Sequence, residues 1–441
     1  MKDFITSNGG DYLDDNFFGR LVDRWRYEKC RAYADHAIPE AQLHLAFCYL
    51  RGKGTRQDTQ EGVRWLLKAA AHGNADAQNC LGILFSGAEG LLPQDEKEAA
   101  KWFRLAAEQG DEFGQVSLAI ALINGTAAER NFAEATQWLR LAADHGYSDA
   151  QYYLGLVYKD NDNIDHNPSL SFQWLTKAAQ QNHPGAQYEL GNCYDFGIGV
   201  KSDPNESFRW TKLAAEHGYD DAQAKLGFCY MRGYGTEIDT SQAFAWFQKS
   251  AMQGLPKGEY FLGECYFLGI GTETDVTQGL EWMKRSADRD FPPAQYRLGN
   301  IFLHGEEAPQ DKPKGVRYLQ TAARSGYPAA QDALGCCCYS GDGVEKDDVQ
   351  AFYWFKESAS HGYVNAFYNL ADCYRKGIGT EKNLTEAISL YLRAAGEGHP
   401  AAMFELGRCY QNGIGVKCDS EEAKKWFKKA EELGITELED N

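Results

Sequence analysis

The 441-residue sequence has no run of lysine and arginine, and its formal net charge is −18. Nucleic acids and anionic membrane surfaces bind to clustered positive charge, so neither is an expected partner. No apolar stretch approaches the roughly 18 residues of a membrane-spanning helix, so membrane insertion is not expected. The first residues, MKDFITSNGGDYLDDNFF, lack the apolar core of a secretory signal. We therefore expect a cytoplasmic protein whose twelve cysteines stay reduced.

Motifs for catalysis and for metal ions are also missing. There is no H-E-x-x-H zinc motif. The segment DNDNID at 160–165 faintly resembles a calcium loop, but Ile164, Asp165 and Ser171 occupy positions five, six and twelve, where that loop needs Asp or Asn, Gly and Glu. The recurring G-x-G pairs lie in turns and break helices, so they are not phosphate-binding loops. We predict no catalytic residue, no cofactor and no metal site.

Tryptophan and leucine recur at almost constant spacing along the chain. The tryptophan series steps by 37 residues once and then by 36: Trp65, Trp102, Trp138, Trp174, Trp210, Trp246 and Trp282, continued by Tyr318, Trp354, Leu390 and Trp426. A second series is leucine throughout: Leu45, Leu81, Leu118, Leu154, Leu190, Leu226, Leu262, Leu298, Leu334, Leu370 and Leu406. A Gly or Ala follows each of these leucines, and another Ala or Gly stands four residues before it. Fixed-period similarity of this kind indicates a repeat protein.

Each repeat reads as two short helices joined by a turn. In residues 222–257, Ala222, Leu226, Cys229 and Tyr230 share one helix face. The sequence RGYGT then breaks the helix, and a second apolar stretch contains Trp246. One such pair cannot bury its apolar face alone, so neighbouring pairs must stack. The sequence thus predicts an all-α fold, a right-handed α/α solenoid (superhelix) of about eleven 36-residue helix–turn–helix repeats.

The pattern A-x-x-x-L-G-x-x-Y-x-x-G-x-G-(V/T), followed by A-x-x-W-(F/L)-x-x-A-A-x-x-G, resembles the Sel-one-like repeat family over about residues 39–434. The resemblance implies a tetratricopeptide-like α-solenoid. It also implies a scaffold or adaptor that binds a protein or peptide, because most family members do so. In a bacterium such a protein could be regulatory, secretion-associated or effector-neutralising. Residues 1–38 are then a capping segment, helical at about 16–36 with Trp25 over the first repeat, and 435–441 an acidic tail.

A secreted, cysteine-rich branch of that family binds or hydrolyses β-lactams, and its repeats carry paired cysteines. The paired position just after the opening Ala holds glutamine here in eight repeats and never cysteine: Gln42, Gln78, Gln115, Gln151, Gln187, Gln223, Gln295 and Gln331. We therefore do not transfer the enzyme activity, and predict a non-enzymatic protein. A β-lactam-directed enzyme and a self-associating assembly component remain the alternatives, and the oligomeric state is left open.

The cysteines and histidines also follow the repeat. Seven cysteines stand seven residues after the opening Ala or Gly, where other repeats carry Leu, Ala, Val or Ile, so they are expected to be buried. The triplet Cys336, Cys337 and Cys338 splits in this register into an outward-facing residue, a member of the buried series and a substitute for tyrosine. His72, His145, His217 and His361 end the second helix of their repeats, where imidazole can contact the last carbonyls.

The face of the first helix opposite its packed side is the candidate binding surface. We number positions from the opening Ala or Gly as position 0, and positions 2, 6 and 9 lie opposite the buried face at about 100° per residue. Tyr, Phe, Asn and Arg are frequent there, as at protein-interaction surfaces. The alternative is that position 2 packs against the neighbouring first helix. The predicted concave partner-binding groove consists of Tyr152, Tyr188, Asn192, Phe228, Tyr260, Phe267, Tyr296, Asn300, Tyr368, Arg375, Phe404 and Arg408.

Overall fold

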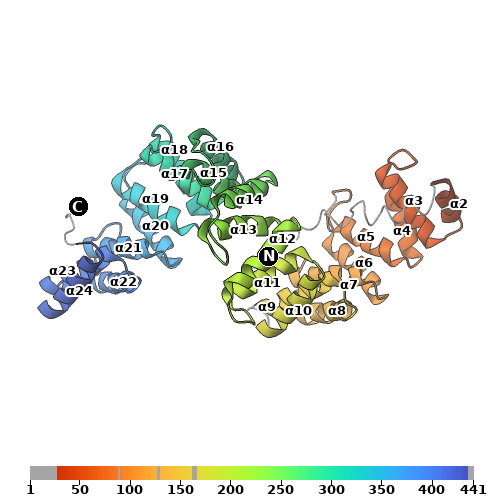
Figure 1. Cartoon of the computed structure of the whole chain (residues 1–441), viewed down its shortest axis with the longest axis horizontal. Coiled ribbons are helices and arrows are strands. Elements are labelled where there is room, and N and C mark those ends of the chain that lie inside the picture. Colours follow the sequence, from red (N-terminus) through yellow and green to blue (C-terminus); the bar gives the residue numbers. More distant parts are fainter. Residues whose placement is uncertain (1–26, 88–89, 127–129, 161–165, 436–441) are drawn as a thin grey trace. The chain divides into compact units, whose positions relative to one another are not determined.

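The computed structural model describes residues 27–87, 90–126, 130–160 and 166–435 (Figure 1). These residues form twenty-three helices and no strand, which confirms the all-α prediction. The chain begins with α2 (Tyr27–Asp35), and the eleven repeats follow as pairs of a helix A and a helix B. The pairs are α3 (Pro39–Arg51) and α4 (Thr59–Ala71), α5 (Ala75–Phe85) and α6 (Glu96–Glu108), α7 (Glu112–Asn124) and α8 (Phe132–Asp144), α9 (Ser148–Lys159) and α10 (Pro168–Gln180), α11 (Pro184–Phe196) and α12 (Pro204–Glu216), α13 (Asp220–Arg232) and α14 (Thr240–Met252), α15 (Pro256–Leu268) and α16 (Val276–Asp288), α17 (Pro292–His304) and α18 (Lys312–Arg324), α19 (Pro328–Ser340) and α20 (Asp348–Ser360), α21 (Val364–Lys376) and α22 (Leu384–Gly396), and α23 (Pro400–Asn412) and α24 (Ser420–Glu432).

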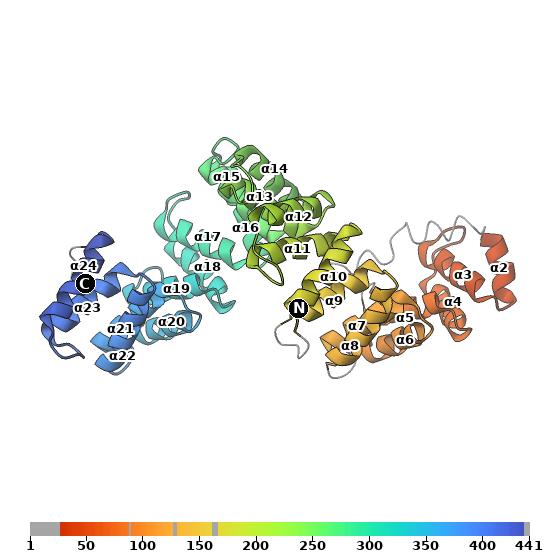
Figure 2. The ribbon, with the colours of Figure 1, turned by 60° about the horizontal axis from the view of Figure 1, so that its bottom comes forward.

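The chain divides into two compact parts. Among the described residues, those up to 222 and 234–236 form the N-terminal part, and 223–233 and those from 237 to 435 form the C-terminal part. Within each part, helix A packs against helix B of its own repeat and against helix B of the repeat before, as with α17 and α18 in Figure 2. In the N-terminal part, α2 packs on α3 and buries its Ala34. The helix α2 thus takes the place that helix B of a preceding repeat would occupy. Trp25 and residues 436–441 lie outside the described residues.

Local signals in the sequence set the ends of the helices. Every helix B of the eleven repeats has an Asp or Asn N-cap whose side chain accepts a backbone N–H of the first turn, as Asp239 does from Gln242. Nine of the helices A end at a glycine with positive φ, for example Gly341 at 80°. A side chain would be strained in that conformation, so glycine stops the helix there.

The leucine series forms the centre of each repeat. All eleven leucines are buried, with Leu370 the most accessible at 5%. The glycine after each leucine lies against the residue that follows the tryptophan position, such as Phe247 opposite Gly227 and Phe355 opposite Gly335. The tryptophans of the series are half-buried except Trp246, and the residue after each of them is the more deeply buried one in nearly every repeat. The small residue therefore permits close approach of helix A and helix B.

A row of buried glutamines joins successive repeats. At position 1, the side-chain Nε2 donates to a backbone carbonyl eight residues earlier, on the preceding helix B or α2, in Gln42, Gln78, Gln151, Gln187, Gln295 and Gln331. In five of these six glutamines the Oε1 atom meets the residue that ends helix B of its own repeat, as with His72 Nδ1 and Gln42 Oε1 at 2.8 Å. The Oε1 atom of Gln295 has no hydrogen-bond partner among the described residues. His72 and His217 thus contact glutamine rather than the helix carbonyls that we expected, whereas His361 contacts both Gln331 and the Glu357 carbonyl.

Glu259 occupies the glutamine position in α15 and is 2% exposed. Its Oε2 has no hydrogen-bond partner among the described residues, and Arg289 Nε lies 3.4 Å from Oε1. Burial raises the pKa of this carboxyl, although Arg289 and Arg285 oppose the change. Glu259→Gln restores the donor that six other repeats use, so we expect it to raise the free energy of unfolding by about 1 kcal/mol at pH 8. Urea denaturation of the two proteins checks this, and an unchanged or lower midpoint for the variant contradicts it.

Candidate partner-binding surface

The cysteines are part of the core. All seven members of the cysteine series are at most 5% exposed, which confirms that they are buried. Cys337 and Cys338 are buried while Cys336 is exposed, so the triplet splits as the repeat register predicts. The twelve cysteines are free thiols, and the described residues contain no group of His, Cys, Asp and Glu arranged to hold a metal ion.

The aromatic residues at position 2 pair with a second aromatic series that the sequence reasoning missed. The partner ring lies 31 residues later, at or next to the N-cap of the following helix A. The centroids are 4.5 Å apart in Tyr152–His183, 5.2 Å in Tyr188–Tyr219, 5.7 Å in Tyr260–Phe291, 5.6 Å in Tyr296–Tyr327 and 4.9 Å in Tyr368–His399. We call these five ring pairs the aromatic ladder. The pairs Tyr152–His183 and Tyr188–Tyr219 belong to the N-terminal part, and the other three belong to the C-terminal part. The signal was present in the sequence as an aromatic or histidine three residues before the opening Ala.

Position 2 therefore both packs and remains partly accessible. Tyr188, Tyr260, Tyr296 and Tyr368 are half-buried, and so is Phe404, whose ring lies 5.2 Å from that of Phe427. Tyr152 is different, because it is 1% exposed beneath His183. This residue is a packed side chain in the structure and cannot line an accessible surface, which corrects its place in the predicted set.

Other predicted residues lie beside the ladder in the C-terminal part. Phe228 is 40% exposed on α13, with its ring 6.4 Å from that of Phe261 and with Arg232 over it. Phe267 is half-buried under the guanidinium of Arg297, 5.5 Å from the ring centroid. Asn300 is half-buried on α17, and Asn192 has the same burial on α11 in the N-terminal part. Their amides suit hydrogen bonds to an extended backbone.

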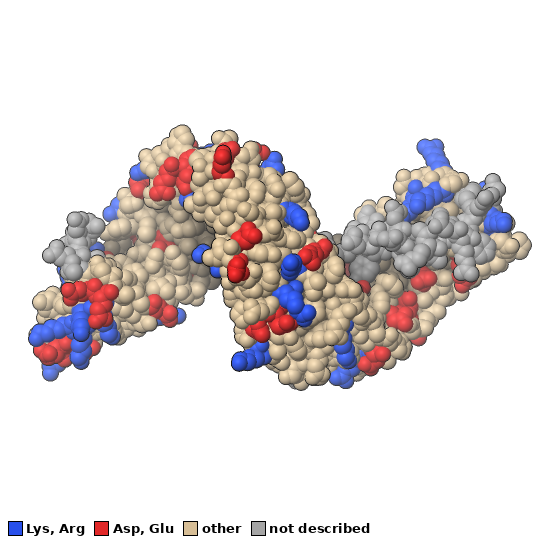
Figure 3. All heavy atoms as spheres, viewed as in Figure 1, with Lys and Arg blue, Asp and Glu red and all other residues tan. Residues whose placement is uncertain are grey.

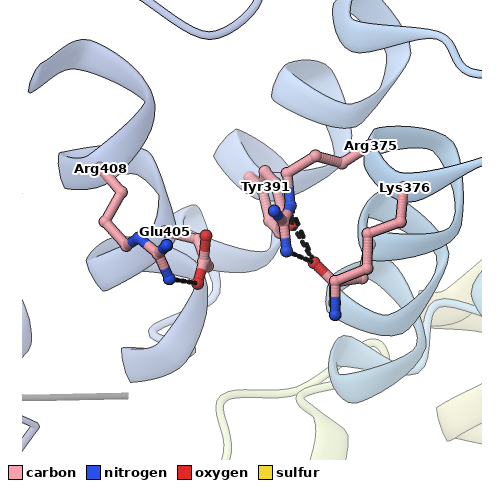
Figure 4. Close-up of polar contacts among 6 residues, drawn as sticks. Arg375, Lys376, Tyr391, Glu405 and Arg408 are labelled. Carbon is pink, nitrogen blue, oxygen red and sulfur yellow. Dashed lines mark hydrogen bonds and ion pairs between the residues drawn. The ribbon is translucent and has the colours of Figure 1, made fainter. Parts of the chain in front are cut away.

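The two predicted arginines are held by acids (Figure 4). Arg375 donates to Asp372 Oδ1 at 2.7 Å and to the Tyr391 hydroxyl at 3.0 Å, and that hydroxyl donates to the same carboxylate. Burial on its own would raise the pKa of Asp372, but hydrogen bonds from Tyr391, Arg375 and Lys376 hold it below the ordinary value. Arg408 lies 3.3 Å from the buried Glu405. Each guanidinium group is thus held by a carboxylate of its own helix.

Charge on the surface is mixed rather than separated. Figure 3 shows acidic and basic side chains interspersed on the viewed face, and α24 carries close pairs such as Lys424–Glu421 and Lys425–Glu422. No helix among the described residues has the length and the apolar character needed to cross a membrane.

Comparison with known proteins gives the family of the chain. The Sel1 repeat model matches eleven consecutive stretches, at 39–74, 75–111, 113–147, 148–183, 184–219, 220–255, 256–291, 292–327, 328–363, 365–399 and 400–435. A solved structure of a protective antigen from uropathogenic Escherichia coli strains, described as having an SLR fold, is 29% identical with a TM-score of 0.63. That match covers 92% of this chain and 87% of the antigen.

Two curated proteins match over shorter stretches. A protein of Neisseria meningitidis serogroup B is 36% identical over 101 residues, and the DAP3-binding cell death enhancer 1 of Rattus norvegicus is 36% identical over 83 residues. These stretches cover 23% and 19% of this chain, and only 20% and 16% of the two relatives. The repeat pattern, the helix pairs and the eleven family matches agree with one another, and the chain belongs to the Sel1 repeat family.

Proposed function

We propose that the chain is a non-enzymatic scaffold that binds a protein or peptide partner along the position-2 side of its helices A. The fold of stacked Sel1 repeats is typical of interaction scaffolds and supports this proposal. The observation that carries it is the aromatic ladder, whose rings, apart from the buried Tyr152, are fixed by their pairing and yet remain half-buried rather than fully covered. Rigid aromatic side chains lose little conformational entropy when they bind, so they make good anchors.

The proposed surface in the C-terminal part comprises Phe228, Tyr260, Phe267, Tyr296, Asn300, Tyr368, Arg375, Phe404 and Arg408. Tyr188 and Asn192 form the corresponding surface of the N-terminal part. The side chain of the half-buried Asn300 makes no hydrogen bond to a described residue, which leaves its side-chain amide available to the backbone of a partner. Arg375 and Arg408 add oriented donors at the side of the rings.

Affinity purification of the full chain from its native host, followed by quantitative mass spectrometry, tests the proposal. We expect a specific partner to be recovered with the unmodified chain, and a variant with Tyr260→Ala, Tyr296→Ala and Tyr368→Ala to recover it at least about tenfold less well, because interface tyrosines commonly contribute more than 1 kcal/mol each. Tyr353→Ala is the matched control, since Tyr353 is 47% exposed on the helix B α20.

Circular dichroism must show that the triple variant remains folded, because its rings also pack. Equal recovery of the partner by the folded triple variant and by the unmodified chain would show that binding occurs elsewhere. The identity of the partner would then decide among a regulatory, a secretion-associated and an effector-neutralising role.

A further inference from the structure

The aromatic ladder of the C-terminal part is interrupted by an acid. Position 2 of α19 holds Asp332, and the residue 31 positions later is Tyr363, which stands where the other pairs carry their second ring. The preceding pair, Tyr296 and Tyr327, has its centroids 5.6 Å apart. Burial raises the pKa of the Tyr363 hydroxyl, and the charges of Tyr296, Asp332 and Tyr327 contribute to the same rise. In the repeat register, Tyr363 thus takes the place of the second ring beside Asp332, and the Tyr296–Tyr327 pair is the preceding step of the ladder.

Asp332 is 7% exposed, and few polar contacts offset the cost of burying its charge. Asn369 Nδ2 donates to Oδ1 at 2.8 Å, and the same amide lies 3.9 Å from the thiol of Cys336. No lysine or arginine of the described residues makes an ion pair with Asp332. The other two buried acids of the described chain both have an arginine, because Arg289 meets Glu259 and Arg408 meets Glu405.

Burial of a carboxylate that has no cation beside it costs free energy. Packing of the neighbouring tyrosine rings gives no reason for an acid at this position. Tyrosine would continue the ladder at this position, as it does at Tyr296 and Tyr368. An acid within a row of aromatic rings can, however, attract a cation, because ring faces carry negative electrostatic potential and the carboxylate supplies full charge. The net charge of −18 favours approach of a positive group from solution.

We propose that Asp332, together with the rings of Tyr296, Tyr327 and Tyr363, receives a lysine or arginine side chain of the bound protein segment. This inference rests on the proposed function, because it names one residue type that the partner must present. The partner's ammonium or guanidinium group forms the ion pair that arginines form with Glu259 and Glu405, while the aliphatic part of the same side chain lies along the tyrosine rings. The neighbouring Asn369 keeps the carboxylate in place.

A random peptide library displayed on phage and selected on the immobilised full chain supplies the probe. Affinities of the selected peptides are measured by fluorescence anisotropy with the unmodified chain and with Asp332→Asn. We expect the peptides to share a lysine or arginine whose replacement by glutamine weakens binding at least about tenfold. Asp332→Asn should weaken the original peptides by the same factor and the glutamine peptides hardly at all, so the two changes are not additive. Glu345→Gln, which removes an exposed carboxylate in the turn after α19, should have no effect.

The outcomes separate this inference from the proposed function. Peptides that lose affinity in the Tyr260, Tyr296 and Tyr368 variant but not in Asp332→Asn overturn the cation site and leave the scaffold proposal standing. Additive effects of the peptide change and Asp332→Asn also overturn the cation site. Selection that yields no peptide bound by the ladder overturns both. Tyr363→Leu, which keeps an apolar side chain but removes a ring face, provides a second variant and should weaken only the peptides that contain the cation.

Discussion

Replacing Gly335 by valine is expected to lower the free energy of unfolding by about 3 kcal/mol, because an overpacked core strains both helices. A Cβ atom on Gly335 would lie 2.6 Å from Cε1 of Phe355, far inside contact distance. Phe355 is 4% exposed and belongs to the buried core of its part of the chain, so its ring cannot move without disturbing other packed side chains. The side chain or the helix must therefore shift, and the leucine beside Gly335 loses its packing.

Gly396→Val is the matched control for this change. Gly396 is the last residue of the helix B α22, whereas Gly335 lies inside the helix A α19, and a Cβ atom on Gly396 would meet nothing within 4 Å. The control should change stability by less than about 1 kcal/mol, which is the scale of helix propensity. Urea denaturation followed by circular dichroism measures both variants, and adding Phe355→Leu to Gly335→Val should restore part of the loss, since Gly299 faces Leu319 in the same way. Equal midpoints for Gly335→Val and Gly396→Val would refute the close-approach explanation.

The repeat pattern predicted the parts of the fold that depend on one helix at a time. The leucine series, the small residue after it and the buried cysteines follow from helical periodicity, because a residue that recurs on the packed face is buried in every repeat. The positive-φ glycines of the turns could be predicted for a similar reason, as few other residues adopt that conformation.

Contacts between residues of different helices could not be obtained from periodicity. Gln331 was assigned no role, although it bonds to Ala323 of the preceding helix B and to His361 at the end of its own repeat. Position 2 was predicted to be either a binding or a packing position, and the structure shows that packing there leaves most of these rings partly exposed. The ring of Tyr296 packs against Tyr327 on one side and stays half-exposed on another. Periodicity assigns a face to a residue, but it does not specify which side chain of the next repeat covers it.

The replacement of Asp332 by asparagine is expected to raise the free energy of unfolding by roughly 3 kcal/mol at pH 8 and by less than about 1 kcal/mol at pH 4. Burial raises the pKa of Asp332 to about 6, although the hydrogen bond from Asn369 opposes that rise. Because the folded-state pKa lies above that of the unfolded chain, the folded protein holds the proton more tightly. The stability that this group gives is complete below the unfolded pKa and is lost as the pH rises through about 6.

Asparagine resembles the protonated acid in shape and still offers an oxygen to Asn369, so the variant should lack this pH dependence. Urea midpoints of the two proteins between pH 4 and pH 8 should therefore diverge as the pH rises. Glu345→Gln is the control at an exposed acid, and its urea midpoints should change with pH in the same way as those of the unmodified chain. A variant that is less stable than the unmodified chain at pH 8 would mean that the carboxylate stabilises the fold.

The combination of this stability measurement with the peptide measurement distinguishes two roles for Asp332. A structural acid that supports the repeat predicts lower stability in Asp332→Asn and, through the weakened fold, lower affinity. An acid kept for a partner predicts higher stability and lower affinity in the same variant, because the carboxylate is paired only in the complex. Opposite signs cannot come from loss of folding. They are therefore the expected result if the interruption of the tyrosine row at Asp332 serves recognition of a cationic side chain.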